Sequence, residues 1–235
     1  MSERFSEVEH FSYDMPASHM VSRISEHPFI VECGCHDGRD SEKFLQWMPG
    51  CRLVCFEPDP RPLERHEPPG FIRRIGADRR VMLIRAAVSD SSGEAVLYRS
   101  SGKPPGERWE GITDWDHSSS IQRPTGHYKM SPWCTFPENH RLKVRTVTLD
   151  EVPRIQCEPI IDLVWADTQG AEGAVIAGAR QTLKRTRWLY TEFYDTPMYE
   201  GQPNLETITG MLPGWQLVAI YGGYNALFYN TKEFC

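Results

Sequence analysis

Apolar runs of strand length alternate with segments of helical spacing along most of this chain. The strand-like runs lie at residues 29–35, 51–58, 80–90, 160–167 and 187–194. The helix-like segments lie at residues 40–48, 61–67, 171–185 and 205–213. Repeated strand–helix units predict a parallel sheet covered by helices. Two further runs, 215–223 and 225–230, predict a closing hairpin that adds an antiparallel edge to this sheet.

Residues 99–143 interrupt the alternation. This segment is rich in proline, glycine and serine and shows little periodicity. A loop of this length is usually functional or disordered, and Trp109, Trp115 and Trp133 argue against full disorder. We predict either a lid or substrate-recognition insertion, or a surface excursion packed by its own aromatic side chains. The chain as a whole is expected to form one domain, with an N-terminal extension at residues 1–28.

Composition narrows the class of protein. A net charge of -6 argues against a general nucleic-acid binder, which usually presents a basic surface. No apolar stretch approaches the roughly 18 residues of a membrane span. The charged N-terminus lacks the apolar region of a secretory signal. The seven cysteines include no CxxC pair or Cys/His cluster, so we expect reduced thiols, a cytoplasmic protein and no cysteine-based metal site.

The first strand-like run ends in the sequence IVECGCHDG at residues 30–38. Glycines after a parallel strand permit a sharp turn and let a ligand approach the backbone. Gly34 fits the first position of a dinucleotide fingerprint, but His36 and Arg39 occupy the positions of its second and third glycines. This spacing disfavours an NAD-dependent oxidoreductase. It favours a ligand without a pyrophosphate.

Two acids mark the ends of the first two strands. Glu57 comes at about the offset where an acid binds ribose hydroxyls, although it could also be a surface acid before the turn FEPDP. Glu32 lies inside an apolar run, where an unpaired carboxylate would cost several kcal/mol. It therefore needs donors, either from a ligand site or from a structural arginine.

The motifs VECGCHDGRDS, CFEPDP, RAAVSDSSGEAVLY, VRTVTLDEV, IDLVWADTQGAEGAVIAGA, LYTEF and YNALFYN occur in this order from about residue 29 to residue 230. Their order and spacing resemble the FkbM family of S-adenosylmethionine-dependent methyltransferases. The resemblance implies a Rossmann-like class I methyltransferase fold. That fold is an α/β domain with a seven-stranded, mostly parallel sheet, an antiparallel final strand and helices on both faces.

The resemblance also implies roles for individual residues. The glycine loop would surround the methionine part of the cofactor. Glu57 would bind the ribose, and the end of the third strand would flank the adenine. The implied cofactor-binding residues are Glu32, Gly34, His36, Gly38, Glu57, Pro58, Ala87, Val88 and Asp167. Asp167 and Gln169 would face the transferable methyl group. The sequence departs from the common motif at Glu32, where aspartate is usual, and at Cys35 and His36.

An alcohol that accepts a methyl group benefits from a nearby base. Asp167, at the carboxyl end of a central strand, is the first candidate for that base or for orienting the acceptor. Glu192 and Asp195 follow the next strand and could complete an acidic cluster that holds Mg²⁺. Glu172, in the first turn of the following helix, either joins this cluster or caps the helix.

The expected acceptor is a hydroxyl of a small molecule such as a sugar or natural product. The aromatic and basic residues of the insertion keep a nucleotide or RNA end as an alternative acceptor. A non-catalytic module that binds the cofactor is a second alternative. The sequence does not predict an oligomeric state.

Overall fold

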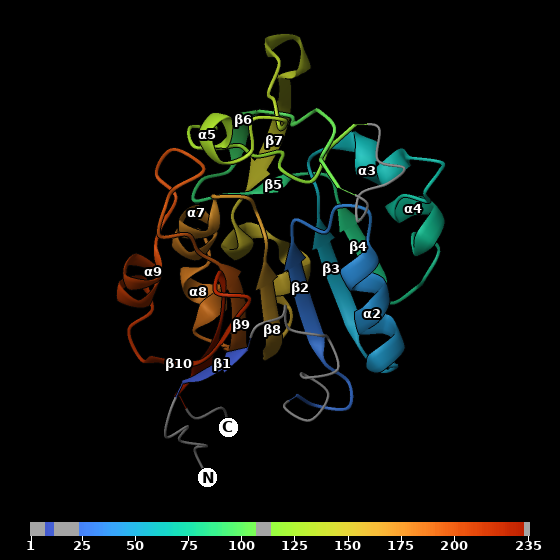
Figure 1. The fold of residues 1–235 in the computed structure, drawn as a ribbon. Helices are drawn as coiled ribbons and strands as arrows, with labels where there is room; N and C mark the ends of the chain where they lie inside the picture. The colour runs from blue at the N-terminus through green and yellow to red at the C-terminus, as the bar shows by residue number, and fades with distance from the viewer. Residues whose placement is uncertain (1–7, 12–23, 107–113, 233–235) are drawn as a thin grey trace.

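The computed structural model describes residues 8–11, 24–106 and 114–232 of the chain (Figure 1). Its main sheet has the strand order β1-β10-β11-β9-β8-β2-β3-β4. These strands are β1 (Glu9–Phe11), β2 (Phe29–Cys33), β3 (Arg52–Phe56), β4 (Val81–Ile84), β8 (Ile161–Ala166), β9 (Thr186–Glu192), β10 (Trp215–Tyr221) and β11 (Asn225–Asn230).

The direction of the strands confirms the predicted class I arrangement. Neighbouring strands from β4 through β3, β2 and β8 to β9 run parallel, whereas β11 is antiparallel to both β9 and β10. The strand count differs from the prediction because β1, from the N-terminal extension, pairs with β10 and makes an eighth strand. The predicted hairpin is present on the outer side of β9, and its second strand, β11, inserts between β9 and β10.

A second, three-stranded sheet has the order β5-β7-β6. Its strands are β5 (Ala87–Val88), β6 (Gly93–Leu97) and β7 (Leu142–Val147). The run at 80–90, predicted as one strand, is therefore divided between the two sheets. The chain turns after β4, where the N–H of Ala86 donates to the carbonyl of Ile84 at 2.9 Å. Figure 1 shows this small sheet above the main one.

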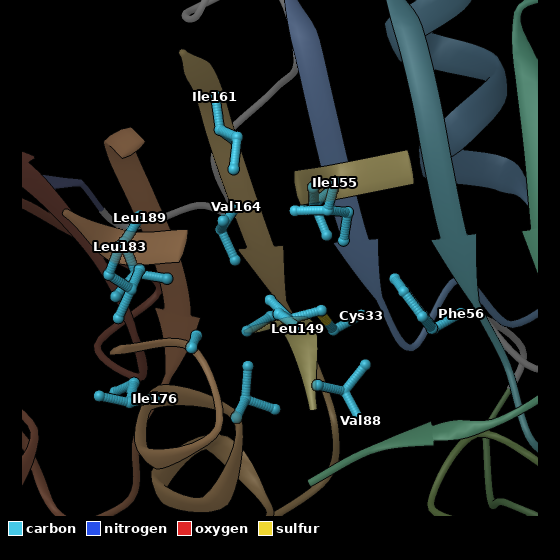
Figure 2. Close-up of a cluster of buried hydrophobic side chains, with 14 of the residues drawn as sticks. Cys33, Phe56, Val88, Leu149, Ile155, Ile161, Val164, Ile176, Leu183 and Leu189 are labelled. Atoms are coloured by element: carbon cyan, nitrogen blue, oxygen red, sulfur yellow. The ribbon is translucent and has the colours of Figure 1, made fainter. Parts of the chain in front are cut away.

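Helices cover both faces of the main sheet, as predicted, and the strands bury alternate residues in the two resulting cores. The helices are α2 (Arg39–Trp47), α3 (Pro60–Glu64), α4 (Phe71–Arg74), α5 (His127–Met130), α6 (Pro153–Gln156), α7 (Glu172–Ala177), α8 (Arg180–Leu183) and α9 (Leu205–Met211), with short 3-10 turns η2 (Glu138–His140) and η3 (Leu149–Glu151). Ile30 packs in the core beneath α2, α3 and α4, and its neighbour Val31 packs in the core beneath α6 to α9. Figure 2 shows side chains of the second core, with Val164 of β8 between Leu189 of β9 on one side and Ile155 of α6 on the other. Among the described residues, no helix is long and apolar enough to cross a bilayer.

The segment 171–185, predicted as one helix, breaks into α7 and α8 at Gly178. A Cβ atom at this position would lie 2.0 Å from the carbonyl oxygen of Ser89, so the chain passes too close to the second sheet for any side chain. This tertiary contact is invisible in the helical periodicity of the sequence.

The described part of the insertion is ordered by contacts at both ends. Isolated β-bridges join Tyr98 to Ser120 and Ser101 to Thr135. A third bridge joins Pro124 of the insertion to Tyr199, which lies outside the insertion. Trp115 and Trp133 pack edge to face, with ring centroids 5.2 Å apart. Residues 107–113, which include Trp109, lie outside the described residues.

The loops after β2 and β8 touch because residue 34 is glycine. Gly34 has a φ of +87°, and a Cβ atom there would lie 1.9 Å from the carbonyl oxygen of Asp167. The N–H of Asp167 also donates to the carbonyl of Cys33 at 3.0 Å. A left-handed backbone is strained for a residue with a side chain, and the approach of Asp167 leaves no room for a Cβ atom.

We expect Gly34→Ala to lower the free energy of unfolding by at least about 2 kcal/mol more than Gly214→Ala does. Gly214 has a similar φ of +84° but no atom within 4 Å of its Cβ position, so it reports the cost of the backbone conformation alone. Urea unfolding of both variants measures the difference. Equal losses would show that the contact with Asp167 does not constrain residue 34.

Candidate active site

A cavity, here the first cavity, opens where the carboxyl ends of β2, β3 and β8 meet. Open α/β sheets bind their ligands at this edge. The first cavity encloses about 650 Å³, part of it open to solvent. The predicted site residues that line it are Gly34, His36, Glu57, Pro58, Ala87, Val88, Asp167 and Gln169. The second sheet and residues 116–121 of the insertion complete its wall.

Glu57 joins the loops that follow β2 and β3. Its carboxylate accepts the backbone N–H of His36 at 3.0 Å and that of Asp59 at 2.8 Å. Burial raises the pKa of Glu57 to about 7, and the nearby charge of His36 opposes the rise. The side chain is 7% exposed and faces the cavity. A buried acid at this strand end can accept the hydroxyl groups of a vicinal diol.

His36 links the glycine loop to the insertion. Its Nε2 lies 2.9 Å from Asp116 Oδ1, and its Nδ1 lies 3.8 Å from Asp37. Burial alone would lower the pKa of His36, but the bonds to these two carboxylates outweigh burial and raise the pKa to about 9. His36 is therefore an imidazolium at neutral pH, although its φ of +48° is unusual for a residue with a side chain.

Arg65 extends this network between the same two carboxylates. It bonds Asp116 Oδ2 at 2.8 Å and Asp37 Oδ2 at 3.1 Å. Burial tends to raise the pKa of Asp116, but the His36 bond and the charges of His36 and Arg65 lower it to about 2. The two cations and two carboxylates fasten the insertion over the first cavity.

His117 stacks on His36 with ring centroids 4.1 Å apart. Burial, together with the positive charge of His36, lowers the pKa of His117 to about 4, so this imidazole is neutral. The ligand atoms of His36, Asp116 and His117 lie within 4.8 Å of one another. Asp116 pairs with both His36 and Arg65, so in this structure the side chains form an ion-pair network.

Asp167, Gln169 and Glu192 come together at the other end of the first cavity. The amide Nε2 of Gln169 donates to Asp167 Oδ1 at 2.7 Å and lies 3.2 Å from Glu192 Oε2. Gln169 has a φ of +54°, and the next residue, Gly170, has a φ of +96°. This turn places the side chain of Gln169 between Asp167 and Glu192. Holding a non-glycine residue in this conformation costs of order 1–3 kcal/mol and is common at functional sites.

Glu172 stabilises that turn. Its Oε1 accepts the backbone N–H groups of Thr168 and Gly170, at 2.9 and 3.2 Å, and the hydroxyl of Thr168 at 3.0 Å. Burial raises the pKa of Glu172 to about 7. Glu172 therefore braces the turn before α7 and does not cap the helix, whose N-cap makes no side-chain hydrogen bond.

Glu32 and Gly38 do not line the first cavity. Glu32 is 1% exposed and accepts hydrogen bonds from the hydroxyl of Ser41, on α2, and from the thiol of Cys55 at 3.6 Å. Burial raises its pKa well above the usual range. The hydrogen-bond donors to Glu32 are thus a hydroxyl and a thiol, and not the ligand or arginine expected from the sequence. Gly38 begins α2, where a Cβ atom would lie 2.9 Å from the ring of Phe71.

Only two of the three acidic residues expected to hold Mg²⁺, Asp167 and Glu192, lie together. Among the described residues, Asp167, Glu192 and Asp195 form no group whose oxygen atoms could share one ion, and Asp195 is exposed. The amide of Gln169 lies between Asp167 and Glu192 instead.

The sequence did not indicate which residues of the insertion reach the cavity. Asp116, 6% exposed, contacts His36 across 80 positions of the chain. The only local signal is an acid between Trp115 and His117 in an otherwise polar loop. Such a signal does not identify the partner.

Comparison with known protein families matches residues 32–218 to the methyltransferase FkbM domain. The chain belongs to the FkbM methyltransferase family. A relative from Sinorhizobium fredii (strain NBRC 101917 / NGR234), named 2-O-methyltransferase NoeI, is 38% identical over 208 residues, which cover 87% of this chain and 80% of the relative. The predicted family and fold class are confirmed, and this FkbM protein is an S-adenosylmethionine-dependent methyltransferase.

Solved structures of low sequence identity resemble this methyltransferase along most of its length. Cofactor-bound Rv0187 from MTB is 14% identical, with a TM-score of 0.48, over 92% of this chain and 78% of that chain. An O-methyltransferase from Bacillus cereus in complex with SAH is 13% identical, with a TM-score of 0.45, over 92% and 81%.

We expect the free energy of unfolding of this FkbM methyltransferase to fall as the pH rises from 6.5 to 9, because His36 loses its proton over this range. A folded-state pKa of about 9 lies above the unfolded value, so the stabilisation is complete below about pH 6.5 and is lost as the pH rises through 9. The loss is on the order of 2–3 kcal/mol. Urea unfolding across this range measures it for the wild type, for His36→Gln and for the control His66→Gln, whose side chain is exposed.

His36→Gln should flatten the profile, and His66→Gln should follow the wild type. If wild type and His36→Gln decline in parallel, the bonds of His36 to Asp116 and Asp37 do not stabilise the folded state.

Proposed function

We propose that this protein transfers the methyl group of S-adenosylmethionine to a hydroxyl of a small-molecule acceptor such as a sugar or natural product. The observation that carries the proposal is the layout of the first cavity. A buried acid, Glu57, lines one part. Asp167 and Gln169 line another, and the amide of Gln169 also bonds Glu192. The name of the relative, a 2-O-methyltransferase, supports transfer to oxygen.

The lining of the first cavity fits the parts of the cofactor in order. Phe56, Ala87 and Val88 supply an apolar wall for the adenine, next to Glu57, whose carboxylate suits the ribose diol. Gly34 and His36 then border the methionine part.

Asp167 and its neighbours are suited to the acceptor hydroxyl. The bound cofactor supplies a methyl group on a positively charged sulfur. Asp167, half-buried in the cavity wall, orients the acceptor hydroxyl and takes its proton. Gln169 positions Asp167 and Glu192 through its amide hydrogen bonds, and the negative charge of the acids favours the sulfonium at this end.

The insertion at 99–143 acts in this proposal as the lid and substrate-recognition element. Its residues 116–121 already form part of the wall of the first cavity, and the His36–Asp116 and Arg65–Asp116 bonds hold them there. Excluding water from this space strengthens every electrostatic interaction within it.

Glu57→Gln should weaken the binding of S-adenosylhomocysteine at least tenfold at pH 8. The amide has one acceptor oxygen where the carboxylate has two, so it cannot serve the His36 and Asp59 N–H groups and the ribose together. Isothermal titration calorimetry measures the change against Glu64→Gln, an exposed acid paired with Arg85. Unchanged affinity in Glu57→Gln would remove Glu57 from the cofactor site.

Asp167→Asn should lower kcat about 100-fold or more while the dissociation constant for S-adenosylhomocysteine changes less than threefold. The substitution keeps the shape of the side chain but removes the base. Single-turnover methyl transfer and calorimetry measure the two quantities, with the exposed Asp90→Asn as control. Full turnover in Asp167→Asn would contradict a role in proton removal.

A further inference from the structure

A second cavity adjoins the first on the side of the insertion. It spans about 490 Å³ of space between side chains, part of it open to solvent. Its walls come from the insertion, from Gln169 after β8 and from the loop after β9. The N–H groups of Thr125 and Gly126 both donate to the carbonyl of Met198 at 2.9 Å, so the insertion and the loop after β9 form one wall.

Aromatic side chains dominate this second cavity. Trp115 and Trp133 meet at an interplanar angle of 90° and so form a corner. Tyr199 and His127 form a second edge-to-face pair, with centroids 4.7 Å apart. Flat rings on two sides suit a ligand that is itself a ring with apolar C–H faces and polar edges.

The charges around the second cavity favour an uncharged ligand. None of the described residues that line it is an acid, a lysine or an arginine. Just beyond it, Glu192 accepts a hydrogen bond from the hydroxyl of Tyr194 at 3.4 Å, and Gln169 bonds Asp167. A phosphate or carboxylate here would have no cation and would face these acids, which is costly in a partly buried site.

His127 offers the second cavity a buried polar atom. The side chain is 5% exposed, and Nδ1 has no hydrogen-bond partner among the described residues. Burial lowers the pKa of His127, so the ring is neutral, with one donor and one acceptor nitrogen. A buried polar nitrogen without a partner is costly, and a ligand hydroxyl, which can donate or accept, would satisfy it.

Gln169 connects the two cavities, because it lines both. The hydroxyl of Tyr199 donates to the carbonyl of Ser118 at 2.8 Å and lies 3.3 Å from Gln169 Oε1. A ligand in the second cavity thus has one edge beside Gln169 and Asp167. That edge is where the proposed function places the reacting hydroxyl.

We propose that the second cavity binds the acceptor as a neutral, hydroxyl-bearing ring, such as one sugar unit, between the corner of Trp115 and Trp133 and the Nδ1 of His127. This inference rests on the proposed function, and it specifies the acceptor class. The ring stacks on the indoles, one hydroxyl forms a hydrogen bond with His127, and another points past Gln169 to Asp167. A phosphorylated or nucleotide acceptor is disfavoured by the uncharged lining.

The test uses the full chain saturated with S-adenosylhomocysteine and a fixed panel of probes. The probes are the methyl glycosides of glucose, galactose and mannose, their linear oligosaccharides of two to four units, and the 6-phosphates of the three monosaccharides. Saturation-transfer NMR detects binding and titrations give dissociation constants. The variants are His127→Phe, which keeps the aromatic packing but removes Nδ1, and Trp133→Ala. The control is Tyr128→Ala, on the same helix but 68% exposed.

We expect at least one neutral glycoside to bind the wild type more tightly than any phosphate. Its dissociation constant should rise at least tenfold in His127→Phe and in Trp133→Ala and less than twofold in Tyr128→Ala. Cofactor affinity, measured by calorimetry, should stay within twofold in all variants, which also shows that they fold. Binding by no neutral glycoside, tighter binding of a phosphate, or unchanged affinity in His127→Phe each overturns the inference. Failure of S-adenosylhomocysteine to bind the wild type would instead refute the proposed function.

Discussion

The contact between the loops after β2 and β8 is the constraint on which the rest of the site depends. Gly34 lies against the carbonyl of Asp167 because it has no side chain, and the N–H of Asp167 bonds the carbonyl of Cys33. This contact fixes the glycine loop, whose His36 N–H binds Glu57, relative to the turn that carries Gln169. Glu57, after β3, and Asp167, after β8, therefore border one cavity although they are distant in the sequence.

Much of the fold could be predicted from the sequence because the main strands are buried on both faces. The runs that became β2, β3, β8 and β9 are continuous and apolar, and the order of motifs identified the family. The errors lie where tertiary contacts override local pattern. Gly178 breaks a periodic helix because it touches the carbonyl of Ser89, and the run at 80–90 divides because its two ends pair with strands in different sheets.

The site was predictable where it follows strand ends and unpredictable where the insertion contributes. Glu57, Asp167 and Gln169 come directly after strands, and the structure places them all on the first cavity. Glu32 looked like a ligand-binding acid, but the hydroxyl of Ser41 reaches it from the next helix. Asp116, His127 and Trp133 lie in a segment without periodicity, so only their tertiary partners reveal what they do.

The account holds that one adenosyl group lies in the first cavity with its ribose on Glu57. A crystal structure of the protein with S-adenosylhomocysteine tests this claim most directly. We predict both ribose hydroxyls within hydrogen-bond distance of the Glu57 carboxylate, the adenine beside Val88 and the sulfur facing Asp167. A ligand bound outside this cavity, or a ribose that makes no contact with Glu57, would contradict the account.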